Sequence, residues 1–322
     1  MVLSDSFGRP ATDLRVSVTE RCNFRCVYCH NEGQGPVQPV SSDATSEISP
    51  EEIERVVRVA ARLGIRRVKL SGGEPLVRRD LEEVVARCAL YAPEVSLVTN
   101  GALLAGRALE LKAAGLDRVN ISVDSLEPSV FREVRGGPLL PVLEGLRAAL
   151  RVGLTPVKLN MVVMPRTLPF VDEMVDYVVS AGEPGALVLN LIQFMPERVR
   201  GGLLTVDMAQ VHGRLARRSD RVEVREMHHR RVYHVGPAKI EVVDPYENPD
   251  FCAACHRLRL TADGFLKGCL NRDDDRVPVR GLNEAGTEAA FRRVVAERVP
   301  YYGGLLKRQA DGSWRPAAGA VA

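Results

Sequence analysis

Six of the seven cysteines form two groups near opposite ends of the chain. The first group is Cys22, Cys26 and Cys29, and the second is Cys252, Cys255 and Cys269. The first ten residues, MVLSDSFGRP, lack the pattern of a secretion signal. In a chain that stays in a reducing compartment, clustered cysteines indicate metal ligands rather than disulfides. Cys88 lies in an apolar helical pattern and is expected to be a small buried side chain.

The spacing of the first cysteine group suits an iron–sulfur cluster. Cys22-x-x-x-Cys26-x-x-Cys29 supplies three thiolates, which leave one iron of a [4Fe-4S] cubane without a protein ligand. The amino and carboxylate groups of S-adenosylmethionine (SAM) can chelate that iron, and an electron from the cluster can then cleave SAM to a 5′-deoxyadenosyl radical. The alternative is zinc, with His30 as the candidate fourth ligand. The loop directly follows a predicted strand and contains Tyr28, which favours the radical interpretation.

The second cysteine group leaves two interpretations open. A CxxC pair with a distant third cysteine is about as typical of structural zinc as of another centre, and His256 is the candidate fourth zinc ligand. Arg257 and Arg259 alternate along the strand-like run that follows, so both lie on one face. They are either solvated surface charges or contacts to the phosphates and base edge of a nucleotide.

The elements that must position these groups alternate between strand and helix. Strands are predicted at 14–19, 66–70, 95–99, 118–123, 157–164 and 187–194, and helical segments near 51–64, 79–91, 103–114, 127–152 and 169–182. Ser49, Pro50 and Glu52 form a capping-box start for the helix at 51. This alternation predicts an α/β fold with parallel strands, either an open sheet or an incomplete barrel.

Polar motifs follow three consecutive strands of this pattern. The first cysteine group follows the first strand, Ser71-Gly72-Gly73-Glu74-Pro75 the second, and Thr99-Asn100-Gly101 the third. In both candidate folds, functional residues gather at the carboxyl ends of the strands. The sequence therefore predicts a single site at one face of the sheet.

Beyond about residue 197 the pattern changes to short antiparallel strands, the second cysteine group and a helix near 286–298. The Gly-, Pro- and Ser-rich segment 32–48 is predicted to be a mobile loop. The predicted divisions are a core at 1–196, a C-terminal domain at 197–304 and a flexible tail at 305–322.

Composition narrows the classes of protein. The chain has 322 residues, enough for one large or two smaller domains, and a formal net charge of +3, which does not decide for or against nucleic acid. Apolar runs such as GALVLNLIQF are too short to span a bilayer. We therefore expect a cytoplasmic protein with no membrane partner. We also expect no nucleic-acid partner, although the net charge does not decide this.

Five strings carry a resemblance to a known family. They are DSFGRPATDLRVSVTERCNFRCVYC, VKLSGGEPLVRRDL, RVNISVDSL, VKLNMVVM and FCAACHRLRLTADGFLKGCL. The chain resembles the radical SAM superfamily and, to about residue 300, its GTP 3′,8-cyclase family of molybdenum cofactor biosynthesis. The resemblance implies an incomplete (β/α)6 TIM-type barrel with a C-terminal α+β extension. It also implies a lyase that uses SAM and two [4Fe-4S] clusters, the second of which binds the guanine ring.

The implied reaction converts GTP to (8S)-3′,8-cyclo-7,8-dihydroguanosine 5′-triphosphate, after the adenosyl radical takes the ribose 3′ hydrogen. The resemblance implies cluster ligands in both cysteine groups. It implies SAM contacts at Tyr28, Gly73, Ser122 and Met195. It implies GTP contacts at Arg15, Lys69, Thr99, Lys158, Arg257, Leu258 and Arg259. Many family members end in Gly-Gly, whereas this chain ends in Ala-Val-Ala, so a role for a C-terminal Gly-Gly is in doubt.

The implied partners are GTP, an electron donor and the next enzyme of the pathway, for a monomer or a homodimer. Two alternatives stay open. One is a radical SAM enzyme that modifies a peptide with the help of an auxiliary cluster. The other is a non-catalytic protein whose cysteines hold zinc.

Overall fold

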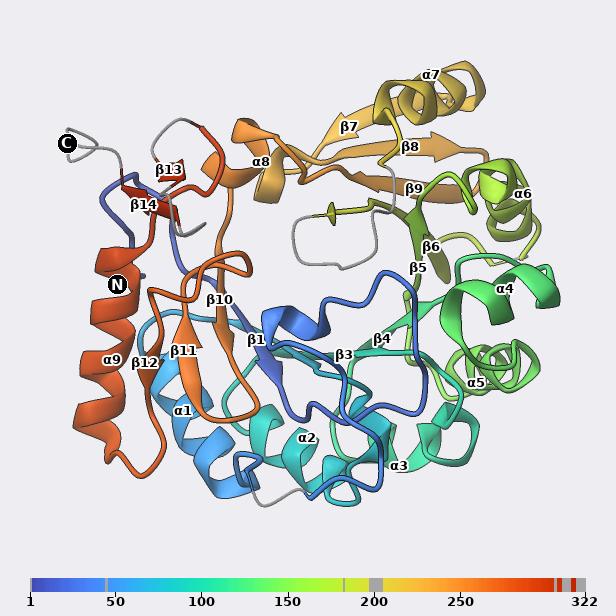
Figure 1. The fold of residues 1–322 in the computed structure, drawn as a ribbon. Helices are drawn as coiled ribbons and strands as arrows, with labels where there is room; N and C mark the ends of the chain where they lie inside the picture. Colours follow the sequence, from blue (N-terminus) through green and yellow to red (C-terminus); the bar gives the residue numbers. More distant parts are fainter. Residues whose placement is uncertain are drawn as a thin grey trace.

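The strands predicted for the N-terminal part form the centre of one 12-stranded sheet in the computed structural model (Figure 1). The structure describes residues 2–43, 46–181, 183–196, 205–303, 306–308 and 314–316. These strands are β1 (Asp13–Ser17), β2 (Arg67–Ser71), β3 (Glu94–Thr99), β4 (Arg118–Ser122), β5 (Val157–Val163) and β6 (Leu187–Gln193). Each is parallel to the next, as the strand–helix alternation predicts.

Helices follow each of the first five strands. They are α1 (Pro50–Arg62), α2 (Leu81–Ala89), α3 (Ala108–Ala113), α4 (Pro128–Arg135), α5 (Leu140–Arg151) and α6 (Val171–Ser180). The predicted capping box of α1 is present, with the Ser49 hydroxyl accepting from the Glu52 amide. The stretch predicted as one helical segment at 127–152 is two helices, because Gly136 ends α4 in the left-handed region (φ 72°).

The C-terminal part extends the sheet at both edges. Its elements are α7 (Met208–Arg218), β7 (Arg221–Val224), β8 (Arg231–Val235), β9 (Ala238–Val243), α8 (Pro249–Ala253), β10 (Arg257–Leu260), β11 (Phe265–Lys267), β12 (Val277–Pro278) and α9 (Glu284–Glu297). The antiparallel pairing predicted for β7, β8 and β9 is present, but β9 is also parallel to β6 and β10 is parallel to β1. The sheet order is β12-β11-β10-β1-β2-β3-β4-β5-β6-β9-β8-β7.

The two faces of the parallel strands differ in polarity. On β1 and β2 the buried apolar residues Leu14, Val16, Val68 and Leu70 alternate with polar ones. The helices α1 to α6 lie along the outer side of the curved strands (Figure 1), so the apolar faces form the core there. The polar residues line the inner side, which gives a partial barrel with a polar interior.

The remaining predicted divisions fall at the edges of what the structure describes. Residues 197–204, at the predicted domain boundary, lie outside the described residues. The predicted tail also lies outside them, except for β13 (Leu306–Arg308) and β14 (Trp314–Pro316), which pair antiparallel. Within the described ranges, no helix is both long enough and apolar enough to cross a membrane.

Candidate functional site

Three adjacent strands place a row of cationic side chains across the inner face of the sheet. Arg15 on β1 is in register with Arg259 on β10 and with Lys69 on β2. Two residues earlier on the same strands, Asp13 is in register with Arg257 and Arg67. Because alternate residues point to the same face, both rows face the interior. Arg15, Arg259 and Lys69 are therefore neighbours on one face of the sheet.

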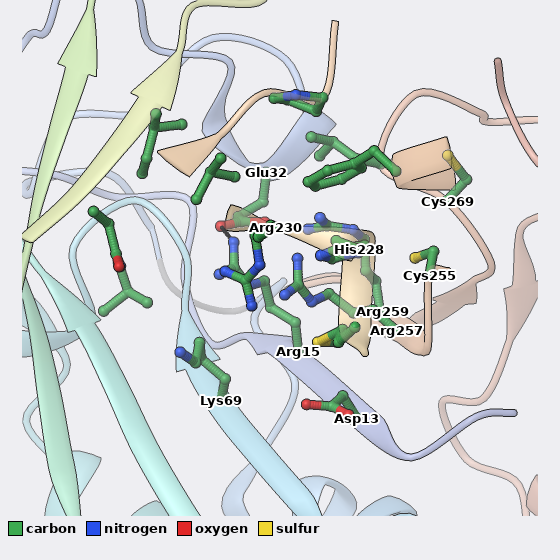
Figure 2. A pocket seen from close by; sticks show the side chains of 18 of the residues that line it. Asp13, Arg15, Glu32, Lys69, His228, Arg230, Cys255, Arg257, Arg259 and Cys269 are labelled. Atoms are coloured by element: carbon green, nitrogen blue, oxygen red, sulfur yellow. Dashed lines mark hydrogen bonds and ion pairs between the residues drawn. The ribbon is translucent and has the colours of Figure 1, made fainter. Parts of the chain in front are cut away.

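These rows form the wall of a cavity of about 400 Å³. Figure 2 shows Arg15, Arg257 and Arg259 together, with Cys255 and Cys269 to one side and Lys69 to the other. The predicted site residues that line the cavity are Arg15, Tyr28, Lys69, Lys158, Met195, Cys252, Cys255, Arg257, Arg259 and Cys269. The cavity thus joins residues from the two ends of the chain.

Glu32 lies between two of the arginines. Its Oε1 is 3.0 Å from Arg15 Nη1, and its Oε2 accepts a hydrogen bond from Arg259 Nη1. Burial alone would raise the pKa of Glu32, but the two guanidinium groups outweigh it and hold the pKa at about 2. Burial, together with the nearby Arg257 and Arg259, lowers the pKa of Arg15 to about 10. Glu32 is therefore an anion at neutral pH, inside a strongly cationic site.

The Lys69 side chain lines the cavity and makes a long hydrogen bond to a neutral side chain. Its Nζ donates to the Asn120 side-chain oxygen at 3.3 Å. Burial and the positive charges of Arg118 and Arg15 lower the pKa of Lys69 well below its usual range. A bound polyanion would reverse this effect, so the lysine suits a phosphate-bearing ligand.

Lys158 is held by a second buried carboxylate, on the opposite edge of the parallel strands. Its Nζ lies 2.9 Å from Glu241 Oε2, and Arg225 and Arg230 approach Glu241 Oε1 at 2.7 and 3.4 Å. Burial opposes ionisation of Glu241, but Arg230, Lys158 and Arg225 together lower its pKa well below the usual range. Three cations on one carboxylate leave this wall positively charged.

The first cysteine group lies on a loop fixed by the Gly72-Gly73 turn. The Gly73 amide donates to the Thr19 carbonyl at 2.7 Å, and the Glu74 amide donates to the Arg21 carbonyl at 2.8 Å. A Cβ added to Gly73 would lie 2.3 Å from the Arg21 carbonyl oxygen. The glycines thus permit a close approach of two backbones, beside the predicted cluster loop.

The thiols of each cysteine group are close enough to influence one another. Burial raises the pKa of Cys26 to about 12, and the Cys29 and Cys22 thiols add to the rise. Among the described residues, no three Cys, His, Asp or Glu side chains are arranged to hold a single metal ion. Three thiols per group nevertheless match in number the donor set of a cubane with one open iron.

The second cysteine group faces the cavity directly. Burial raises the pKa of Cys269 to about 11, and the Cys255 and Cys252 thiols add to the rise. Cys252 lies in α8, whose N-cap Asn248 accepts from the Phe251 amide. Arg9 Nη1 donates to the Cys252 carbonyl at 3.0 Å, which ties the N-terminal segment to this group. The three thiols therefore border the same space as the arginine row.

Tyr28 connects the first loop to buried polar residues that the sequence did not single out. Its hydroxyl donates to Asp124 Oδ2 at 2.6 Å and also contacts Arg135. Asp124 further accepts from the Val162 amide at 2.7 Å and is fully buried. The ring of Tyr28, predicted as a SAM contact, is thereby fixed at the edge of the cavity.

Besides Cys22, Cys26 and Cys29, four predicted residues lie apart from the cavity lining. The Thr99 hydroxyl donates to buried Glu74 at 2.6 Å, and the Gly73 amide is bound to Thr19. Leu258 is fully buried between Arg257 and Arg259, because alternation turns it to the outer face. Ser122 ends β4. For these four, a ligand contact stays a prediction.

Sequence reasoning missed Glu32, Glu241, Arg225, Arg230, His228 and the strand residues Asn120, Asn160 and Asn190. A charged or amide residue inside an otherwise apolar strand was the available signal for Glu241 and the three asparagines, because burial of such a group is costly unless it has partners. His228 had no such signal. Its backbone is left-handed (φ 65°) and its ring stacks on Phe251, with centroids 3.9 Å apart.

Two family models and curated relatives match most of the chain. Residues 16–178 match the radical SAM superfamily, and residues 188–302 match the family described as Molybdenum Cofactor Synthesis C. The chain is 46% identical to a probable GTP 3′,8-cyclase of Halobacterium salinarum, over 97% of this chain and 93% of the relative. It is 43% identical to a probable GTP 3′,8-cyclase of Methanosarcina mazei, over 95% and 92%.

Solved structures show the same fold at low sequence identity. Streptococcus suis SuiB bound to its precursor peptide SuiA matches with a TM-score of 0.64 at 13% identity, over 89% of this chain and 68% of that one. The structure of anSMEcpe with bound AdoMet matches with a TM-score of 0.59 at 15% identity, over 86% and 79%. These likenesses confirm the predicted α/β partial-barrel fold.

Proposed function

The chain belongs to the radical SAM superfamily and, within it, to the GTP 3′,8-cyclase family, and we propose that its cavity converts GTP to (8S)-3′,8-cyclo-7,8-dihydroguanosine 5′-triphosphate. This is the first step of molybdenum cofactor biosynthesis. The observation that carries the proposal is one cavity that combines the Arg259–Arg15–Lys69 row with the second cysteine group. A nucleoside triphosphate needs such cations for its phosphates.

The two clusters are assigned on different grounds. As a radical SAM protein, the chain binds SAM and a [4Fe-4S] cluster, and Cys22, Cys26 and Cys29 are the proposed ligands. A second [4Fe-4S] cluster on Cys252, Cys255 and Cys269 is our proposal, supported by three close thiols that face the cavity. When bound, the first cluster and SAM would supply the 5′-deoxyadenosyl radical needed for abstraction of the ribose 3′ hydrogen.

The protein's own residues position the substrate and shield it. Arg257 and Arg259 precede the β10–β11 turn that leads to Cys269, so phosphate and base contacts come from one connected segment. Arg15 and Lys69 continue the cation row away from the cysteines. A nucleotide held at both ends has its ribose in between, where proximity and exclusion of water favour a single hydrogen abstraction.

The test is an anaerobic assay of reconstituted protein with dithionite, SAM and GTP. We expect 5′-deoxyadenosine and the cyclised nucleotide in equal amounts, and neither product at a comparable rate with ATP. Equal formation of 5′-deoxyadenosine with and without GTP would contradict the substrate assignment. One zinc per chain and no labile sulfide would contradict the cofactor assignment as well.

Our remaining proposals concern the setting of this reaction. We propose a cytoplasmic enzyme that receives electrons from a separate donor and passes its product to the next enzyme of the pathway, as a monomer or homodimer. The peptide-modifying alternative is less well supported, because the cavity wall is a row of cations suited to phosphates.

A further inference from the structure

Glu32 lies between two arginines of the cationic row. It contacts Arg15 on β1 and Arg259 on β10, and these two residues are direct cross-strand partners. Figure 2 shows the Glu32 carboxylate directed at the arginine group from the opposite side to Asp13. Its carboxylate holds the position between two guanidinium groups that a phosphate oxygen would take, because both anions accept the same forked hydrogen bonds.

The backbone that carries Glu32 is strained. Asn31 and Glu32 both adopt the left-handed region, with φ of 45° and 51°. Asparagine tolerates this conformation, but for Glu32 it is unfavourable. The Asn31 side-chain oxygen is also buried without a hydrogen-bond partner among the described residues. The other buried carboxylate of the site, that of Glu241, is carried by the regular strand β9 and not by a left-handed turn. The contacts of Glu32 with the arginines therefore maintain a turn that is unfavourable by itself.

This turn is short and is anchored at both ends. On one side the Cys29 amide donates to the Cys26 carbonyl at 3.1 Å. On the other side the Gln34 side chain donates to Ser17 Oγ at 2.7 Å and accepts from the Ala262 amide at 2.8 Å. Residues 30–33 can thus change conformation without moving β1, β10 or the turn after β10.

We propose that Glu32 is an internal substitute for a substrate phosphate, which holds Arg15 and Arg259 in register and is displaced when the triphosphate binds. The inference rests on the proposed function and deepens it, because it concerns the same site. A triphosphate and the Glu32 carboxylate cannot share these two arginines without repulsion at close range. Substrate therefore competes with Glu32 and releases the strained turn, which follows directly after a ligand of the first cluster.

The primary experiment measures binding to the reconstituted protein under anaerobic conditions by calorimetry. Glu32→Gln removes the competing charge, and we expect it to tighten binding of GTP and of inorganic tripolyphosphate by about fivefold or more, within the usual range of coupling between sites. Binding of guanosine, which has no phosphate, should stay unchanged. Unchanged or weaker tripolyphosphate binding by Glu32→Gln would overturn the proposal.

Glu47→Gln is the matched control. Glu47 is similarly covered, with 9% of its side chain exposed against 12% for Glu32, and it pairs with Arg21 outside the cavity. We expect this variant to bind GTP and tripolyphosphate with wild-type affinity. If Glu47→Gln gained as much affinity as Glu32→Gln, the loss of any carboxylate would be enough to tighten binding. This result too would overturn the proposal.

A second measurement uses the unmodified protein and does not depend on whether a variant folds. The Gly33 amide donates to the His30 carbonyl at 2.8 Å, and the Gln34 amide donates to the Asn31 carbonyl at 2.9 Å. We expect tripolyphosphate to speed hydrogen exchange at these two amides, although ligands usually slow it. Slower exchange there would contradict displacement. If tripolyphosphate acts as expected but GTP gives no cyclised product, the proposed function fails while this inference stands.

Discussion

The two cysteine groups contain the same number of thiols but lie in different surroundings. The first follows β1 on a loop held by backbone hydrogen bonds to the Gly72-Gly73 turn, near the buried acids Glu74 and Asp124. The second borders a cavity lined by arginines, and its own residues are among the lining. Identical ligands thus lie on a fixed loop with charges of both signs nearby in one case, and border a cationic cavity in the other.

This difference fits a division of labour between the two proposed clusters. A centre that cleaves SAM needs a rigid loop, because a small displacement misplaces the radical relative to its target. A centre that holds a nucleotide needs neighbouring cations for the phosphates. Surroundings, rather than the ligand residues themselves, separate the two roles.

The largest effect expected is that of Cys22→Ser, which removes one ligand of the first group. We expect iron to fall from about eight to about four per chain, with 5′-deoxyadenosine below detection and the second group still loaded. Iron and sulfide analysis with product assays measures this. Cys88→Ala, a change at a fully buried cysteine outside both groups, is the control and should keep full iron. Normal SAM cleavage by Cys22→Ser would remove the distinction between the groups.

Cys269→Ser should separate the two roles. The first cluster stays bound, so SAM is still cleaved slowly, but the cyclised nucleotide is lost because GTP is no longer held beside the cavity arginines. Electron paramagnetic resonance of the reduced protein and chromatography of both products provide the measurements. Wild-type yields of cyclised product would show that the second group is structural.

Gly73→Ala tests whether the glycine turn fixes the first loop. The added Cβ would lie 2.3 Å from the Arg21 carbonyl oxygen, so the loop must shift. We expect at least about a tenfold loss of SAM cleavage, since a displacement of about 1 Å can cost a hundredfold in rate, while tripolyphosphate binding is unchanged. Gly106→Ala, where no atom lies within 4 Å of the added Cβ, should behave as wild type.

The role of Gly73 also shows what could be predicted from sequence. Motif spacing located both cysteine groups and the strand–helix order predicted β1 to β6 to within about two residues, because these depend on local periodicity. The contact of Gly73 with SAM stays a prediction, and the structure shows in addition that its backbone lies close to Arg21. Which backbone a glycine approaches is a tertiary property that the sequence pattern does not contain.

The pairings inside the cavity were beyond sequence reasoning for a similar reason. The resemblance implies that Lys158 contacts GTP, and that contact stays a prediction. The structure adds that the buried lysine is paired with Glu241, 83 residues away in the chain. Glu32 was predicted only as part of a mobile loop. Its contact with Arg259 joins residues 227 apart in the chain, through the parallel pairing of β10 with β1.

The smallest effect expected is in the pH dependence of GTP binding. It tests whether Lys69, at the end of the cation row away from the second cysteine group, contacts the phosphates. Burial and the charges of Arg118 and Arg15 lower the pKa of Lys69 in the free protein, and a bound triphosphate raises it again. The complex therefore binds more protons than the free protein, and GTP affinity falls as pH rises between the lowered pKa of Lys69 in the free protein and its higher pKa in the complex, by at most tenfold per pH unit. Lys69→Arg keeps its charge throughout and should show a flatter profile by calorimetry. Parallel profiles for the two proteins would mean that Lys69 is not in contact with the phosphates.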